Sequence, residues 1–135
     1  MSSPAYDIQK ILTTEMDSSI ALTLGQTLFI GREPSKPANC VTIFDTPGGS
    51  PQLSPNILED YEYLAIQIRV RNTDYITGWN LIQQIQLLLH GRASYESSGF
   101  VYTVIYCSSG PAMLDWDGNN NVRFIINFKL QRRRS

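Results

Sequence analysis

The chain has 135 residues, of which 42% are hydrophobic and 17% charged, and its formal net charge is −1 at pH 7. This length is typical of one compact unit, so we expect a single domain over residues 1–135. A net charge this close to zero excludes the broad basic surface of proteins that bind nucleic acid or anionic lipid. We therefore expect no membrane partner and no sequence-specific binding of nucleic acid.

Targeting segments and disulfides are not expected either. No apolar run approaches the roughly 20 residues that a membrane-spanning helix needs. Residues 1–10 lack a basic stretch followed by an apolar one, so they do not form a signal peptide. The two cysteines, Cys40 and Cys107, are too few for a disulfide framework, and both sit in apolar runs. We expect reduced, buried thiols in a soluble chain that is made in a cytoplasm.

The first elements in chain order are a helix and two strands. Ser3 is a favourable N-cap and Pro4 suits the first helical position, so a helix is predicted over residues 4–16. Its apolar residues recur at helical spacing and are Ala5, Ile8, Ile11, Leu12 and Met16. Short strands are predicted at residues 27–31 and 40–45, separated by a proline-rich connector.

A loop and the clearest strand come next. Residues 46–56 contain three prolines, two glycines and two serines, which predicts an exposed loop that is poorly ordered in an isolated subunit. Residues 63–71 alternate between apolar and polar side chains, which predicts a central strand with one buried face. The side chains expected on the buried face are Leu64, Ile66, Ile68 and Val70.

The second half of the chain predicts one helix and two strands. Asp74 or Thr73 can cap a helix over residues 75–89, which His90 and Gly91 end. Strands are predicted at residues 100–107 and 122–130, joined by a polar turn. The predicted fold class is α+β, with a largely antiparallel or mixed sheet of four to five strands and two helices packed mainly on one face.

The sequence predicts no catalytic residue, no cofactor and no metal site. His90 is the only histidine, and its place at a helix end favours a capping role over catalysis. Residues 115–120 share letters with a calcium loop but place the glycine at the fourth position, so a hairpin turn is favoured. Residues 132–134 are three arginines, interpreted as a solvated tail that protects the last strand, with contact to DNA as the alternative.

Two further function classes remain open. A small metal-dependent enzyme such as a nuclease would use Asp45, Glu59 and Asp60 with nearby arginines around a metal ion. These carboxylates lie on different segments, and nothing in the pattern brings them together, so this is the less favoured reading. A structural assembly protein needs only folded faces for its neighbours and polar loops that become ordered on contact.

Three stretches carry a resemblance to a known family, and they are GREP at 31–34, CVTI at 40–43 with DT and two glycines after it, and IRVR at 68–71 before the capped helix. In this order and spacing the chain resembles the minor capsid or tail terminator proteins of long-tailed bacteriophages. The resemblance implies a homo-oligomeric ring, usually of six subunits, that caps the tail tube, stops its growth and presents a surface for the filled head.

The same resemblance implies partners and a location. The partners are other copies of the chain, the tail tube protein and the head connector or head-completion protein, and genome DNA passes through the ring. The protein is made in the host cytoplasm and resides in the virion, in the tail at the head–tail junction. The alternative within phage assembly is a head-completion or connector adaptor protein at the same junction.

The resemblance transfers no catalytic or binding residue, so interface candidates come from charge and loop character. We expect arginines of the central strand to face carboxylates of the adjacent subunit in a head-to-tail ring, with the glycines of the loop available to partners. The candidate residues are Gly48, Gly49, Glu59, Asp60, Glu62, Arg69 and Arg71.

Overall fold

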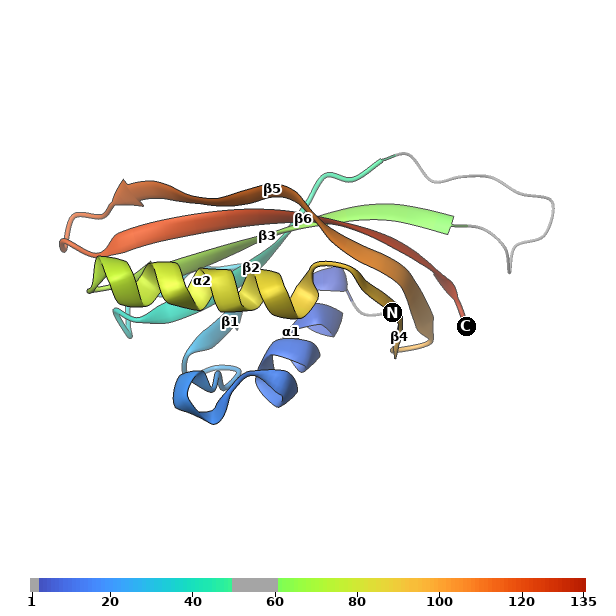
Figure 1. Ribbon diagram of the computed structural model, residues 1–135, viewed down its shortest axis with the longest axis horizontal. Coiled ribbons are helices and arrows are strands. Elements are labelled where there is room, and N and C mark those ends of the chain that lie inside the picture. The colour runs from blue at the N-terminus through green and yellow to red at the C-terminus, as the bar shows by residue number, and fades with distance from the viewer. Residues whose placement is uncertain (1–2, 50–60) are drawn as a thin grey trace.

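The computed structural model describes residues 3–49 and 61–135 (Figure 1). Two α-helices, one short 3₁₀ helix and six strands are found in these residues. In chain order they are α1 (Pro4–Glu15), η1 (Ser18–Ile20), β1 (Leu28–Ile30), β2 (Cys40–Thr46), β3 (Tyr61–Asn72), α2 (Tyr75–Leu89), β4 (Arg92–Ser97), β5 (Phe100–Trp116) and β6 (Val122–Arg134).

The strands form one mixed sheet in the order β1-β2-β3-β6-β5-β4. β1 pairs with β2 in parallel, and every other neighbouring pair is antiparallel. The α+β class is therefore confirmed, but the predicted four to five strands are wrong because the sheet has six. The missed strand is β4, an edge strand with mostly polar residues, in which Ser94 has a φ of 55°. Such a strand has no apolar alternation for a sequence pattern to detect.

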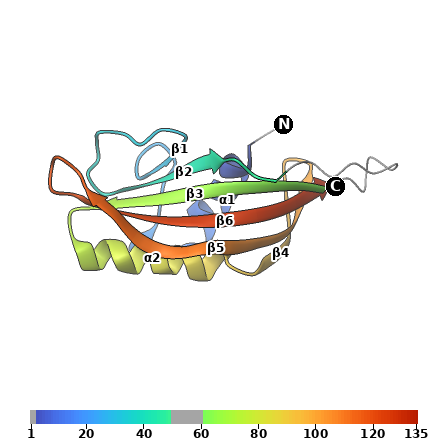
Figure 2. The same ribbon diagram turned by 90° about the horizontal axis from the view of Figure 1, so that it is seen from above.

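Both helices cover the same face of the sheet, as predicted. Figure 1 shows α1 and α2 below the strands, and Figure 2 shows α2 running along the side that carries β5 and β4. α1 packs against β1, β2 and β3, whereas α2 packs against β3, β5 and β6. The side chains that β3 and β6 bury under the helices are Ile66, Ile68, Val70, Phe124, Ile126 and Phe128. The predicted buried face of the central strand is thus confirmed, with Leu64 partly buried at its margin.

The helix ends follow the predicted capping chemistry. The Ser3 hydroxyl oxygen accepts a hydrogen bond from the Tyr6 backbone N–H at 3.2 Å, and Asp74 accepts one from the Thr77 N–H at 2.9 Å. His90 is the C-cap of α2, and its Nδ1 accepts the backbone N–H of Cys107 at 2.9 Å. The histidine therefore joins the end of α2 to the edge of β5, which is a structural role.

The last two strands are longer than predicted. β5 continues nine residues past Cys107 because register shifts against β6 absorb the Ser-Ser-Gly-Pro stretch that resembles a turn. β6 continues to Arg134, so the interpretation of residues 132–134 as a solvated tail is wrong for Arg132, which is 7% exposed. The strand was underestimated because a run of arginines carries no alternation of apolar and polar residues.

The remaining local expectations have mixed outcomes. The hairpin turn after β5 is confirmed, since the Asp117 carboxylate accepts the backbone N–H groups of Asn119 and Asn121. Thr46, placed in the predicted loop, belongs to β2, and residues 50–56 of that loop lie outside the described residues. Both cysteines are free thiols, Cys40 buried and Cys107 half-buried. Within residues 3–49 and 61–135, no helix is long and apolar enough to cross a membrane.

Candidate assembly surfaces

No helix among the described residues covers the second face of the sheet, here called the open face (Figure 1). Polar side chains cross it from strand to strand. Gln67 of β3 donates to the Asn127 Oδ1 of β6 at 3.2 Å, and Asn127 donates to the Ser109 hydroxyl of β5 at 2.8 Å. Arg69 Nε donates to the Gln67 Oε1 at 2.8 Å. These mutual hydrogen bonds fix the orientation of the polar groups, so the open face is a preorganised polar surface.

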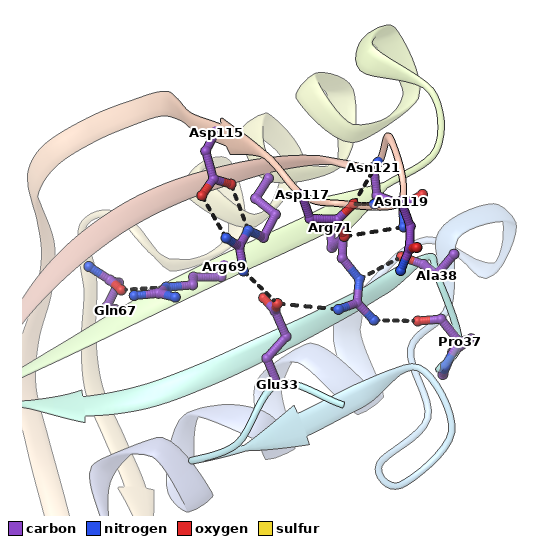
Figure 3. A network of polar contacts seen from close by, with 11 residues as sticks. Glu33, Pro37, Ala38, Gln67, Arg69, Arg71, Asp115, Asp117, Asn119 and Asn121 are labelled. Atoms are coloured by element: carbon purple, nitrogen blue, oxygen red, sulfur yellow. Dashed lines mark hydrogen bonds and ion pairs between the residues drawn. The ribbon is translucent and has the colours of Figure 1, made fainter. Parts of the chain in front are cut away.

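Glu33 connects the segment after β1 to the open face (Figure 3). Its Oε1 accepts from Arg71 Nη1 of β3 at 3.2 Å and from Arg123 Nη1 of β6 at 3.0 Å. Arg71 also donates to the backbone carbonyls of Pro37 at 2.8 Å and Ala38 at 3.0 Å. One carboxylate and two guanidinium groups therefore tie residues 31–39 to two central strands.

Asp115 extends this ionic network to β5. Arg123 donates through Nε and Nη2 to the two carboxylate oxygens of Asp115, each at 2.6 Å. This bidentate hydrogen bonding lowers the pKa of Asp115 and, with a contribution from Glu33, raises the pKa of Arg123. The chain Asp115–Arg123–Glu33–Arg71 thus crosses the sheet, and the second oxygen of Glu33 is buried without a hydrogen-bond partner among the described residues.

A second polar cluster lies on the helix-covered side, near the start of α1. The Asp7 carboxylate is 0% exposed and accepts hydrogen bonds from the Tyr102 hydroxyl and, at 2.9 Å, from the Ser97 hydroxyl. Arg132 Nη1 donates to the Tyr102 hydroxyl at 3.1 Å, and Arg132 Nη2 donates to Glu62 at 3.1 Å. Burial and the bond to Asp7 raise the pKa of Tyr102, which keeps its proton. The cluster fastens α1 to β3, β4, β5 and β6.

A hollow of 470 Å³ lies on the open face, where residues 47–49 pass over β3. Tyr63, Tyr106, Lys129 and Gln131 contribute to its lining. A side chain at Gly48 would bring its Cβ to 2.2 Å from the Tyr63 carbonyl oxygen, so only glycine permits this approach of two backbones. The hollow combines aromatic and hydrogen-bonding groups, which is a composition typical of protein contact surfaces.

The structure separates the charged residues that the sequence predicted as an interface. Glu62 lies on the helix side of β3, where its carboxylate accepts from Arg132 of the same chain. Arg69 lies on the open face, with its guanidinium 5.0 Å from the centre of the Phe44 ring. Arg71 is 6% exposed, so the expectation that it projects outward is wrong. Its buried position follows from residues 31–39, which fold over it.

The other predicted interface residues are placed only in part. Gly48 and Gly49 are exposed beside β3, and Glu59 and Asp60 lie outside the described residues. A role of these residues in subunit contacts stays a prediction.

The residues proposed for a metal-dependent enzyme are not assembled by the part of the chain that is described. Asp45 accepts a hydrogen bond from the Ala5 backbone N–H at 2.9 Å, so its carboxylate satisfies a backbone donor in the first turn of α1. Within residues 3–49 and 61–135, no group of three or more histidine, cysteine, aspartate or glutamate side chains could hold a metal ion.

The hub residues of both networks were not predicted from the sequence, and they are Asp7, Glu33, Asp115 and Arg123. Arg123 had a detectable signal, because it alternates with apolar residues on a predicted strand and therefore points to the open face. Glu33 and Asp7 had none, since their partners are more than thirty residues away in the chain.

The sequence profile of the family described as bacteriophage tail terminator protein matches residues 9–134. The match runs from α1 through β6 and therefore includes every strand of the sheet. A search of curated proteins gives no match. Because the family profile covers nearly the whole chain, the chain belongs to the bacteriophage tail terminator family.

Proposed function

We propose that this protein forms a ring of identical subunits that caps the phage tail tube, stops its polymerisation and provides the surface on which the filled head docks. The observation that carries this proposal is the family match over residues 9–134. The family is one of structural proteins, so no catalytic step is required of the chain. In this role the protein is a component of the virion at the head–tail junction, made in the host cytoplasm.

The surfaces of the chain support an assembly role. The open face presents hydrogen-bonding groups whose positions are already fixed, such as Gln67, Asn127 and Ser109. A preorganised surface loses little conformational entropy when a partner binds, which favours repeated, identical contacts. The two edges of the sheet are different from each other, so copies of the chain can meet head to tail around a ring.

The test is tail length in the phage that encodes the protein. Cells infected with a phage in which this gene is interrupted should accumulate tails of variable and excessive length without heads, as seen by electron microscopy. Supplying the intact gene on a plasmid should restore a single tail length. Tails of normal, uniform length in the absence of the protein would contradict the proposal.

The same experiment separates the alternative of a head-completion or connector adaptor. Loss of an adaptor would leave tails of the correct length beside unattached heads. Loss of a terminator changes the tube itself, because nothing stops addition of tube subunits at its end.

A further inference from the structure

We infer that neighbouring subunits of the proposed ring contact each other through opposite edges of the sheet. The apolar end of β5 on one copy docks into the basic hollow beside β1 on the next copy. This inference rests on the proposed ring. It names the two surfaces and the second copy of the chain as the occupant.

The first surface is the β5 edge patch, defined as Met113, Leu114 and Trp116 of β5 with Tyr75 of α2. β4 pairs with β5 only as far as Ile105. Beyond that point, β5 has only β6 as a strand partner among the described residues, so one side of the strand is an open edge.

The β5 edge patch is unusually apolar for a surface. Met113 is 47% exposed, Leu114 38% and Trp116 52%. The Trp116 ring stacks on the Tyr75 ring with the ring centres 6.5 Å apart, which holds the indole in place while leaving half of it exposed. Tryptophan, tyrosine and methionine are enriched at the centres of protein interfaces, where aromatic anchors supply much of the binding free energy.

The shape of β5 indicates side-chain docking and not the addition of another strand. Its pairing with β6 shifts register between Cys107 and Ser109, between Ser109 and Ala112, and again between Met113 and Asp115. Pro111 also lies in this part of the strand, and proline cannot donate a hydrogen bond to a neighbouring strand. An edge of this kind resists regular pairing but still displays its side chains.

The second surface is the β1 edge hollow, at the opposite edge of the sheet. Figure 2 shows β1 and β5 on opposite sides of the strands β3 and β6. The hollow has a volume of 610 Å³. Its lining residues are Phe29, Ile30, Arg32, Glu33, Pro34 and Ser35. Phe29, Ile30 and Pro34 supply apolar surface to receive the β5 edge patch.

The charges on the two surfaces are complementary. Arg32 and Lys36 are exposed at the β1 edge, while the charge of Glu33 is engaged by Arg71 and Arg123. The β1 edge hollow is therefore basic. Unlike charges on facing surfaces steer association and fix the orientation of the partners.

The β5 edge patch has carboxylates as its immediate neighbours in the chain. Asp115 and Asp117 flank Trp116, and Asp74 precedes Tyr75. Hydrogen bonds from Arg123, from the Asn121 backbone and from Thr77 lower the pKa values of these three groups, respectively, so they remain ionised. Asp115 is paired with Arg123, so Asp74 and Asp117 supply the negative charge beside the apolar patch, and this charge is opposite to that of Arg32 and Lys36 beside the apolar hollow.

A contact between two different edges is heterologous, so each subunit can use both surfaces at once, and a series of copies forms a ring when the rotation between neighbours closes. Two variants break one surface each. Met113→Ala with Trp116→Ala removes the apolar anchors of the β5 edge patch, and Arg32→Glu with Lys36→Glu reverses the charge of the β1 edge hollow. Leu87→Ala on α2 and Arg134→Glu at the end of β6 are matched controls, because both side chains are exposed and belong to neither surface.

The measurement is native mass spectrometry of each protein alone and of an equimolar mixture of the two broken variants. We expect each broken variant alone to remain a single subunit, while the wild type and both controls form the ring. The mixture should give a dimer with one copy of each variant and nothing larger, since only one intact pair of surfaces remains. Circular dichroism melting of each variant separates a broken contact from a broken fold.

Three results would overturn the inference in distinguishable ways. If the wild type forms a ring and the broken variants form it equally well, these edges are not the contact, and the proposed function stands. If the mixture of folded variants stays as single subunits, the contact is not heterologous. A wild type that remains a single subunit at every concentration contradicts the ring itself.

Discussion

Arg132 was expected on the surface from the sequence, but it is buried in the folded chain. Its guanidinium lies 3.8 Å from the centre of the Phe100 ring and bridges the Tyr102 hydroxyl and the Glu62 carboxylate. Burial by itself lowers the pKa of Arg132, but the contacts with Tyr102 and Glu62 outweigh burial and raise it. The positive charge is therefore held beside the buried Asp7 carboxylate, 3.9 Å away.

Replacing Arg132 should destabilise the fold strongly. Arg132→Ala removes the guanidinium group that lies 3.9 Å from the buried Asp7 carboxylate, and removal of one partner from a buried ionic cluster costs about 3–5 kcal/mol. The neighbouring Arg134 is exposed, so Arg134→Ala is a matched control with an expected change within about 0.5 kcal/mol. Urea unfolding followed by circular dichroism measures both free energies of unfolding. Equal stabilities of the two variants would show that the cluster does not hold the α1 end in place.

Gly48 is the second residue whose chemistry the structure defines. A Cβ at this position would lie 2.2 Å from the Tyr63 carbonyl oxygen and 2.7 Å from the Leu64 Cα, both backbone atoms that cannot rotate away. Gly48→Ala should therefore lower the free energy of unfolding by about 1–3 kcal/mol, as other overpacked sites do. At Gly110 an added Cβ meets nothing within 4 Å, so Gly110→Ala serves as the control. If thermal melting shows the same change for both substitutions, the close approach over β3 is not a constraint on this chain.

At the scale of elements, the apolar alternation of β3 and β6 and the capping residues of α1 and α2 were enough to predict those elements. β4 and the second half of β5 were not predictable. They lie at an exposed edge of the sheet, so their sequences lack the alternation of apolar and polar residues that a strand with one buried face has. The charged hubs were not predictable for another reason. Glu33 and Arg71 are brought together by the fold of residues 31–39, which local spacing does not reveal.

The ion pair between β5 and β6 should make stability depend on pH. Because its pKa is lower in the folded chain than in the unfolded chain, Asp115 stabilises the fold above its ordinary pKa of about 4 and loses this contribution as the pH falls through the lowered value. We expect the melting temperature of the wild type to fall more steeply between about pH 5 and pH 2 than that of Asp115→Asn. Thermal melts followed by circular dichroism at a series of pH values give both curves. Parallel curves would contradict a stabilising role for the Asp115–Arg123 pair.

At the scale of the whole molecule, the helices occupy one face of the sheet and leave a polar open face and two unlike edges. The fold class and the family could be predicted from the sequence, because both depend on patterns spread over the entire chain. The surfaces at the sheet edges could not be predicted, because the outward charges were expected at Glu59, Asp60, Glu62, Arg69 and Arg71. The folded chain buries Arg71, pairs Glu62 internally and displays apolar side chains at the end of β5.

Closure of copies of this chain into a ring can be measured by native mass spectrometry of the purified protein over a range of concentrations. We expect one dominant closed assembly, of six subunits by the family resemblance, with no growth beyond that size as concentration rises. A chain that remains a single subunit throughout, or a ladder of ever larger assemblies without a preferred size, would contradict it.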